Sequence, residues 1–298
     1  MTDVINDGQV LNTLDFEPPS RSHWRRKVRA VLRRRPLLPL GVLVLLTVLA
    51  WALVPGAFSH YDPLLGVPSQ ALQSPSAEHW FGTDQLGRDL YSRAVHGSAI
   101  SLQATALAVA IALLVGILLG VIAGYFGGLV DALLMRVVEV LMAIPSLLLA
   151  MAIITVLGFG TLNIALAVGL SSVATFARLV RGEVLRWRTS VFVEAAVSCG
   201  VGPWTIIRRH ILAHAAGPVL ALAALEFGSA VLAVSALSFL GYGAPPPQPE
   251  WGLLISEGRN YMVAAWWYTT LPGLVVAAVV LAANQLARAV QDIQGDQS

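Results

Sequence analysis

Six long apolar segments, separated by more polar connections, constrain what this 298-residue chain can fold into. A helix needs about 20 apolar residues to cross the hydrocarbon core of a bilayer, and each segment approaches or exceeds that length. The composition agrees, because 56% of the residues are hydrophobic and only 12% are charged, against about 25% charged in soluble domains. We therefore expect an all-α membrane protein with six transmembrane helices, near residues 37–54, 98–125, 130–157, 161–180, 215–241 and 267–288.

The distribution of Lys and Arg predicts the orientation of the chain. If residue 1 lies in the cytoplasm, 16 of the 19 Lys and Arg residues fall on the cytoplasmic side, and the others are Arg88, Arg93 and Arg259. Cytoplasmic connections of membrane proteins are enriched in these residues. The count assigns residues 1–36 and 289–298 to cytoplasmic tails and residues 55–97 to an extracytoplasmic loop.

A basic block precedes the first apolar segment, and it consists of Arg21, Arg25, Arg26, Lys27, Arg29, Arg33, Arg34 and Arg35. A nucleic-acid site is one interpretation of such a block. Because the block abuts residues 37–54, we favour an anchor against anionic lipid headgroups, with no nucleic-acid partner. A cleaved signal peptide has a shorter apolar core nearer the terminus, so residues 37–54 are interpreted as a retained first transmembrane helix.

A moderately polar, cationic stretch over residues 191–213 interrupts the apolar pattern. It is predicted to form two short helices and a turn. The first helix would end at Gly200, since glycine adopts the left-handed conformation without penalty, and the second would begin at Pro203. Helical spacing would place Trp204, Ile207 and Ile211 on one apolar face, with Arg208 and Arg209 mostly elsewhere. This 191–213 segment therefore has the properties of a docking site.

Small residues and one proline mark two of the predicted spans. Gly116, Gly120 and Gly124 recur every four residues, which lets helix backbones approach closely in lipid. Packing within one subunit is favoured over a subunit interface. Pro145 removes a helical hydrogen bond and is predicted to bend the third span.

Two predicted spans carry carboxylates. Arg136 and Glu139 are three residues apart, which favours a local ion pair. Glu226 lies about twelve residues inside the fifth span with no partner visible in the sequence. It is a candidate for the translocation path, with a contact to a partner permease or protonation as alternatives.

Metal and catalytic sites are not indicated by the sequence. His210 and His214 have the spacing of a metal pair, but no third ligand is evident, and Cys199 is the single cysteine, which excludes an intrachain disulfide. The single lysine, Lys27, does not belong to a P-loop, and no nucleophile elbow is present. We expect a non-catalytic chain without cofactor or metal, driven by a separate ATPase or by an ion gradient.

Several stretches together carry a resemblance to a known family. They are Phe81–Asp84 with Gly87–Asp89, Ser92–Arg93, Gly124–Gly128, Ala177–Gly182, Glu194–Ala196 with Gly200, Leu237–Gly241, and Pro246 through Trp251–Gly252 to Glu257–Arg259. In this order they resemble the permease subunits of binding-protein-dependent ABC importers, most of all the second, C-type subunit of dipeptide, oligopeptide and nickel importers. The resemblance implies a type I ABC importer permease fold with a cytoplasmic coupling helix.

The resemblance also implies partners and a location. They are a second homologous permease subunit in a heterodimer, two cytoplasmic ATPase subunits that bind ATP and Mg²⁺, and an extracytoplasmic substrate-binding protein, all at a bacterial inner membrane. The ATPase-coupling residues would be Glu194, Ala195, Ala196, Gly200, Pro203, Trp204 and Arg208. Glu194 would hold the loop by charge-assisted hydrogen bonds. The loops that face the binding protein would present Asp84, Arg88, Asp89, Trp251, Glu257 and Arg259.

Short peptides are the predicted cargo. Related subunits serve nickel, glutathione and other small solutes, so these remain alternatives within the same class. A gradient-driven carrier is the alternative outside it, but it usually shows paired ionisable residues in broken helices.

Overall fold

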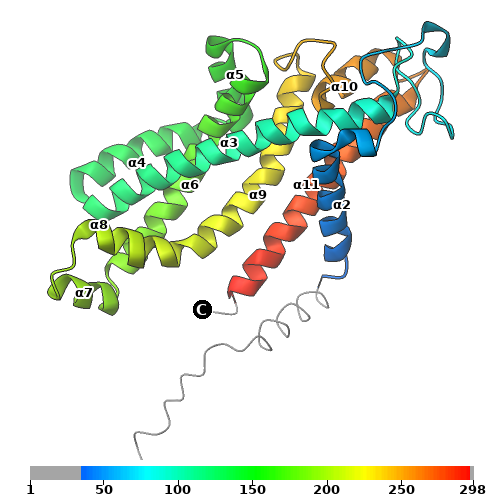
Figure 1. Ribbon diagram of the computed structural model, residues 1–298. Helices are drawn as coiled ribbons and strands as arrows, with labels where there is room; N and C mark the ends of the chain where they lie inside the picture. The colour runs from blue at the N-terminus through cyan, green and yellow to red at the C-terminus, as the bar shows by residue number, and fades with distance from the viewer. Residues whose placement is uncertain (1–34, 296–298) are drawn as a thin grey trace, which may run out of the picture.

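The computed structural model describes residues 35–295, with side chains through residue 292, and this range is helical apart from loops and one isolated bridge between Thr83 and Asp89 (Figure 1). Residues 1–34, which make up most of the predicted N-terminal tail and of its basic block, lie outside this range. The helices are α2 (Leu38–Leu53), α3 (Leu90–Phe126), α4 (Gly128–Ala143), α5 (Ser146–Leu157), α6 (Thr161–Arg188), α7 (Val191–Ser198), α8 (Pro203–Thr205), α9 (Leu212–Phe239), α10 (Trp251–Gly258) and α11 (Trp266–Gly295).

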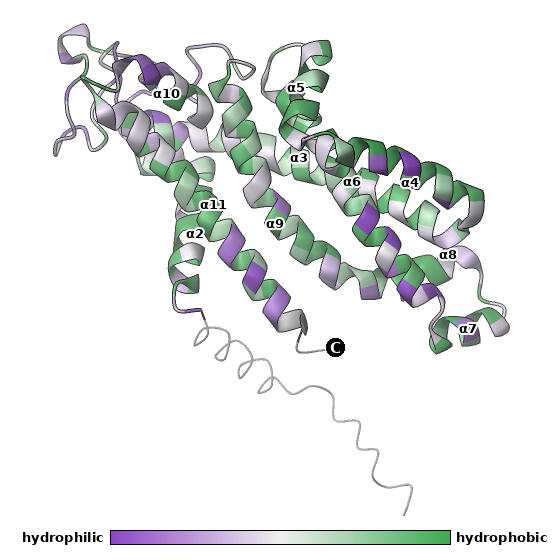
Figure 2. Ribbon diagram, turned by 180° about the vertical axis from the view of Figure 1, so that it is seen from behind, coloured by the Kyte–Doolittle hydropathy of each residue, from purple (hydrophilic) through white to green (hydrophobic). Residues whose placement is uncertain are grey.

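Within residues 35–295, four helices are long and apolar enough to cross a membrane, namely α3, α6, the continuous helix from α8 through α9, and α11. The bent pair α4 and α5 adds a broken span, and the 16-residue α2 is apolar but shorter. These elements coincide with the six apolar segments, which confirms the predicted fold class. Figure 2 shows the apolar residues along the helices, with polar residues gathered in the connections and near the lower ends of α6 and α11.

Several helices extend beyond the apolar segments. Helix α3 begins at Leu90 rather than near residue 98, because the Asp89 carboxylate accepts a hydrogen bond from the backbone N–H of Ser92 at 2.6 Å and caps the helix. Helix α6 continues to Arg188, and the helix that contains α9 begins at Pro203. Caps and tertiary contacts set these boundaries, whereas hydropathy reports only the part in lipid.

Pro145 separates α4 from α5, whose axes differ by 98°. Ile144, which precedes it, is extended with φ −96° and ψ 129°, as expected for a residue before proline. The predicted bend in the third span is confirmed, and it is sharp enough to make two helices.

The glycine stripe of α3 packs against α6 of the same chain. A Cβ atom at Gly120 would lie 2.7 Å from the Ala177 carbonyl oxygen, and one at Gly124 would lie 2.8 Å from the Val184 Cβ. The absence of side chains therefore allows the two helices to cross closely. Packing within one subunit, the favoured prediction, is confirmed.

The start of α2, the end of α11 and the 191–213 segment lie toward one end of the molecule, and the 55–97 loop with α10 lies toward the other (Figure 1). We call these the α7 end and the α10 end. At the α7 end, Arg35 Nε is 2.7 Å from Asp292 Oδ2, which joins the beginning of α2 to the end of α11.

Candidate functional site

The 191–213 segment has the local structure that its sequence predicts. Helix α7 is followed by Gly200 at φ +75°, and α8 begins at Pro203. The first helix ends at Ser198, shortly before Gly200. The two predicted helices and the turn between them are therefore confirmed. This local structure does not test the prediction that the segment binds a partner.

Buried aliphatic side chains fix this segment to the spans on either side. Val193 is 3% exposed, Ile206 1% and Ile211 0%, and they pack with Val180 and Val184 of α6. The segment is therefore a rigid extension of α6 and α9 and not a loose loop.

Most of the predicted coupling residues lie on the surface of the segment. Glu194, Ala195, Gly200, Pro203, Trp204 and Arg208 are exposed, and Ala196 is half-buried. Within the described residues the Glu194 carboxylate forms no hydrogen bond or ion pair. The expectation that Glu194 holds the loop through its own side chain is thus wrong for contacts inside this chain, and the carboxylate faces outward.

Trp204 does not share the buried face that the helical spacing predicted. Its side chain is 72% exposed, whereas Ile207 is 7% and Ile211 0% exposed. Residues 206–211 form a π-helical turn, which is wider than an α-helical turn and rotates the following side chains relative to Trp204. Val191 and Val197 of the same segment are also exposed apolar side chains, at 82% and 57%.

Two arginines of α6, the helix that leads into the segment, bond to the end of α3 and the start of α4. Arg181 donates from Nε and Nη2 to the two carboxylate oxygens of Asp131 at 2.5 and 2.6 Å. Arg188, three residues before α7, donates from Nη1 to the carbonyl oxygens of Gly124 and Tyr125 at 3.2 and 2.9 Å. These are terminal carbonyls of α3, which lack helical partners. Sequence reasoning missed this role, although Arg181 lies in a stretch that carries the family resemblance.

The histidine pair belongs to an aromatic cluster. The His214 ring lies 4.5 Å from the Trp187 ring and 5.1 Å from the Phe192 ring, measured between centroids. Its Nδ1 is 2.6 Å from the His210 carbonyl oxygen. These contacts connect α6, α7 and the start of α9.

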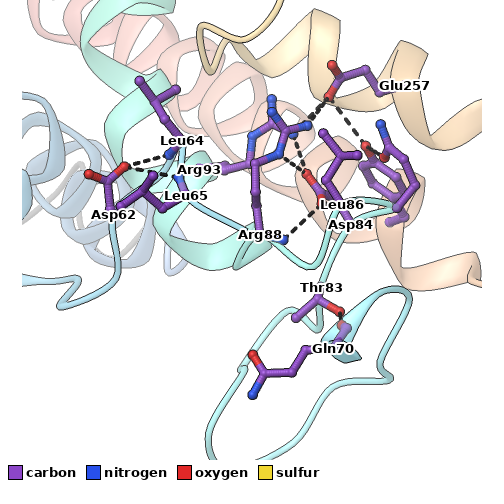
Figure 3. A network of polar contacts seen from close by, with 12 residues as sticks. Asp62, Leu64, Leu65, Gln70, Thr83, Asp84, Leu86, Arg88, Arg93 and Glu257 are labelled. Atoms are coloured by element: carbon purple, nitrogen blue, oxygen red, sulfur yellow. Dashed lines mark hydrogen bonds and ion pairs between the residues drawn. The ribbon is translucent and has the colours of Figure 1, made fainter. Parts of the chain in front are cut away.

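At the α10 end, a buried ionic network joins the 55–97 loop to α3, α10 and α11 (Figure 3). Asp84 accepts hydrogen bonds from Arg88 Nε at 2.5 Å and from Arg93 Nη1 at 2.6 Å. Arg93 Nη1 also donates to Glu257 Oε2 at 2.9 Å, and Tyr268 donates to Glu257 at 3.3 Å. The side chains of Asp84 and Arg93 are 0% exposed and that of Glu257 is 12% exposed.

This network corrects the predicted loop surface. Asp84, Arg88, Asp89 and Trp251 are buried, and Glu257 is half-buried. Asp89 lies 2.9 Å from His79 Nδ1, and Trp251 Nε1 donates to the Ala94 carbonyl oxygen at 2.9 Å. Charges of both signs in one loop pair with each other when they leave water. Of the six predicted residues only Arg259 is exposed.

Glu250 is a buried carboxylate that the sequence did not reveal. Its side chain caps α10 by accepting from the Leu253 N–H at 3.0 Å, and Ser101 Oγ donates to it at 3.1 Å. It is 0% exposed, and burial raises the pKa of the Glu250 carboxyl above its ordinary value. The position before Trp251, at the start of a short apolar helix, is the signal that identifies such a cap.

The carboxylates of Glu139 and Glu226 differ in their surroundings. Glu139 pairs with Arg136 at 3.1 Å on the surface of α4, as predicted. Glu226 lies in the middle of α9, half-buried, and borders a cavity of about 200 Å³ between α5, α6 and α9. Among the described residues no Arg or His forms an ion pair with it.

The arrangement of the helices identifies the class of protein. It matches a chain of the inward-facing MetNI methionine ABC transporter with a TM-score of 0.52, covering 66% of this chain and 96% of that chain at 18% identity. The chain thus has the fold of an ABC importer permease. Residues 116–295 match the family described as binding-protein-dependent transport system inner membrane component, and the chain belongs to this family.

Individual relatives agree over most of their length. The dipeptide transport system permease protein DppC of Alkalihalophilus pseudofirmus is 38% identical over 91% of this chain and 89% of its own. The glutathione transport system permease protein GsiD of Pectobacterium atrosepticum is 37% identical, with 91% and 90% covered. The probable D,D-dipeptide transport system permease protein DdpC of Escherichia coli is 36% identical, with 88% of each chain covered. The predicted family is confirmed, and the gradient-driven alternative is removed.

Proposed function

We propose that this chain is the membrane permease subunit of an ATP-driven importer for short peptides. A substrate-binding protein would deliver the peptide at the α10 end, and a pair of ATPase subunits would bind at the α7 end. The chain itself would hold neither ATP nor Mg²⁺, which belong to the ATPases, and it would catalyse no reaction. A second, homologous permease would complete a heterodimer around the pathway.

The exposed apolar surface of the 191–213 segment is the observation that carries this proposal. Val191, Val197 and Trp204 are largely exposed, although the segment is fixed to α6 and α9 by a buried core. Apolar side chains on a rigid projection are suited to a partner's groove. Arg181 and Arg188 of α6, the helix that leads into this projection, bond to α4 and α3, so a movement passed from the projection to α6 and α9 would reach four spans.

The orientation follows from the same assignment. The ATPases are cytoplasmic, so the α7 end would face the cytoplasm, together with the start of α2 and the end of α11. The bias of Lys and Arg toward this side supports that orientation. The protein would then lie in a bacterial inner membrane with both termini in the cytoplasm.

Short peptides are supported as cargo by the relatives. Their names specify dipeptides, D,D-dipeptides and glutathione, which is itself a tripeptide. Glutathione is therefore the second candidate, and nickel or another small solute would be a departure from the substrates of these three relatives.

Stimulated ATPase activity of the purified, reconstituted complex tests this function. The complex would be isolated through a tag on this chain and assayed with binding protein and a panel of dipeptides, tripeptides, glutathione and Ni²⁺. We expect peptide-loaded binding protein to stimulate hydrolysis and Glu194→Ala to weaken the stimulation, whereas Glu139→Ala, which removes an exposed carboxylate of α4, leaves it unchanged. Absence of a copurifying ATPase contradicts the proposal, and stimulation by glutathione or nickel alone changes only the cargo.

A further inference from the structure

The cavity beside Glu226 combines one carboxylate with several hydroxyl groups. It has a volume of about 200 Å³ and lies between α5, α6 and α9. Its polar lining residues are Ser146 of α5, Ser171, Ser172 and Thr175 of α6, and Glu226 and Ser229 of α9. The remaining wall is aliphatic, so the carboxylate is the single charged group of the lining that the described residues form.

The cavity lies at mid-depth of the spans. Glu226 is at the middle of the 28-residue helix α9, and Ser146 begins α5 immediately after the 98° break in the α4–α5 span. Irregular backbone at membrane depth is tolerated where it lines a cavity within the protein. In secondary transporters, which are a different class, interrupted spans also line the site where the transported ligand binds.

The electrostatics of the cavity favour a cation. Ser172 of α6 lines the same cavity as Glu226, and among the described residues no Arg or His forms an ion pair with the Glu226 carboxylate. Ser171 donates its proton to the Val168 carbonyl oxygen at 2.8 Å, so its oxygen is available as an acceptor. A carboxylate and nearby hydroxyl oxygens match the three N–H donors of a primary ammonium group.

We propose that this cavity binds the α-ammonium group of the peptide during its passage, with Glu226 as the counter-ion. This inference rests on the proposed function, because every unmodified peptide carries that group. Pockets that enclose a whole ligand usually measure about 300–1,000 Å³, so this cavity holds one end of a peptide. A single charged contact also suits a transport intermediate, which has to release its cargo again.

Thiol chemistry at Ser229 tests the counter-ion role. Ser229 is exposed and lines the cavity, so Ser229→Cys in a Cys199→Ser background places one cysteine beside Glu226. In the reconstituted complex we expect a cationic methanethiosulfonate to modify it at least tenfold faster than an anionic one, after correction for their rates with a free thiol. Glu226→Gln abolishes this preference. An unchanged preference in Glu226→Gln overturns the proposal.

Cargo protection and uptake then test the ligand. Peptide-loaded binding protein with ATP slows the modification, whereas peptide-free binding protein with ATP does not, and equal rates overturn the assignment to cargo. Peptide uptake per ATP hydrolysed falls about tenfold in Glu226→Gln and less in Glu226→Asp, but it is unchanged in Glu139→Gln, an exposed carboxylate of α4. If Glu226→Gln instead reduces recovery of the assembled complex, Glu226 pairs with a partner subunit and the inference fails. If peptide-loaded binding protein does not stimulate the ATPase of the wild-type complex, the proposed function is contradicted instead. The preference of the Ser229→Cys thiol for the cationic reagent then still tests whether Glu226 is a counter-ion.

Discussion

Arg188 of α6 donates a hydrogen bond to the backbone carbonyl of Tyr125, at the end of α3, over 2.9 Å. The same nitrogen contacts the Gly124 carbonyl, and α7 begins three residues after Arg188. The arginine therefore supplies a partner for carbonyls that the end of a helix leaves free. It also joins the end of α6, which leads into the 191–213 segment, to the end of α3.

Replacing Arg188 should weaken the coupling between ATPase and permease. Mutations along a coupling route change the coupling by about 0.5–2 kcal/mol, which is about 2- to 30-fold. We expect Arg188→Ala to lower the peptide-stimulated ATPase activity of the complex within this range. Arg186→Ala is the matched control, because Arg186 is exposed and, among the described residues, its side chain contacts only the Trp187 ring, with Cζ 5.2 Å from the ring centroid. Equal effects of the two substitutions would argue against a role for the α3 contact.

Trp204 should be an anchor of the ATPase interface. It is 72% exposed on a rigid segment, and buried aromatic anchors at interfaces contribute about 2 kcal/mol or more. Trp204→Ala is therefore expected to weaken binding of the ATPase subunits about 30-fold, measured by titrating them onto the permease pair in nanodiscs. Val263→Ala, at an apolar position of the α10 end that is even more exposed than Trp204, should have no effect. An unchanged affinity of the Trp204→Ala variant for the ATPase subunits would show that Trp204 does not contribute to this interface.

Arg93 should be essential for folding of the α10 end. It is fully buried between Asp84 and Glu257, and removal of one partner of a buried ion pair costs about 3–5 kcal/mol. Arg93→Met should lower the thermal unfolding midpoint strongly, and adding Asp84→Asn should recover part of the loss. Arg136→Ala, whose side chain is 79% exposed, should change stability by about 0.5 kcal/mol at most. A small effect of Arg93→Met would show that the network is not needed for stability.

Glu250 should make stability depend on pH. Burial raises the pKa of its carboxyl in the native state. The protonated Glu250 carboxyl therefore contributes its full stabilisation below its pKa in the unfolded state, about 4.5. This contribution is lost as pH rises through the native-state pKa, because the native state must then bury a charged carboxylate. Glu250→Gln removes this titration. The unfolding midpoint of Glu250→Gln relative to wild type should rise with pH above about 4.5.

The helix cap of α10 separates this effect from a loss of structure. The Glu250→Gln variant retains an oxygen that can accept from the Leu253 N–H, whereas Glu250→Ala loses it and leaves a cavity. Glu250→Ala should therefore be destabilised at every pH. If the difference in unfolding midpoint between Glu250→Gln and wild type does not vary with pH, the raised native-state pKa of Glu250 is contradicted.

Cys199 provides a direct test of orientation. It is exposed at the α7 end and is the single cysteine of the chain. In membranes without the ATPase subunits, a membrane-impermeant maleimide should label it in inside-out vesicles and not in right-side-out spheroplasts. The double variant Cys199→Ser with Glu78→Cys should show the reverse pattern. Labelling of Cys199 from the outside would show that the α7 end faces away from the cytoplasm.

The sequence by itself determined the features that depend on local interactions. Six apolar segments specified the apolar helices because each segment must satisfy its own backbone groups in lipid. Gly200 and Pro203 specified the turn of the 191–213 segment through their backbone preferences, and the spacing of Arg136 and Glu139 specified their ion pair. The family resemblance followed from the same kind of short stretches.

Only the tertiary structure decided which of these polar residues face a partner. Arg93 and Glu257 are 164 positions apart, so no local pattern shows that they neutralise each other in the interior. Nor does a local pattern show that, of the six residues predicted to face the binding protein, only Arg259 is exposed. Trp204 turns outward because a π-helical turn follows it. Glu226 acquires its hydroxyl-lined cavity from α5 and α6, which come together with α9 only when the chain folds. Burial and pairing across the fold are collective properties, because each depends on where distant segments pack and not on the residues beside them in the chain.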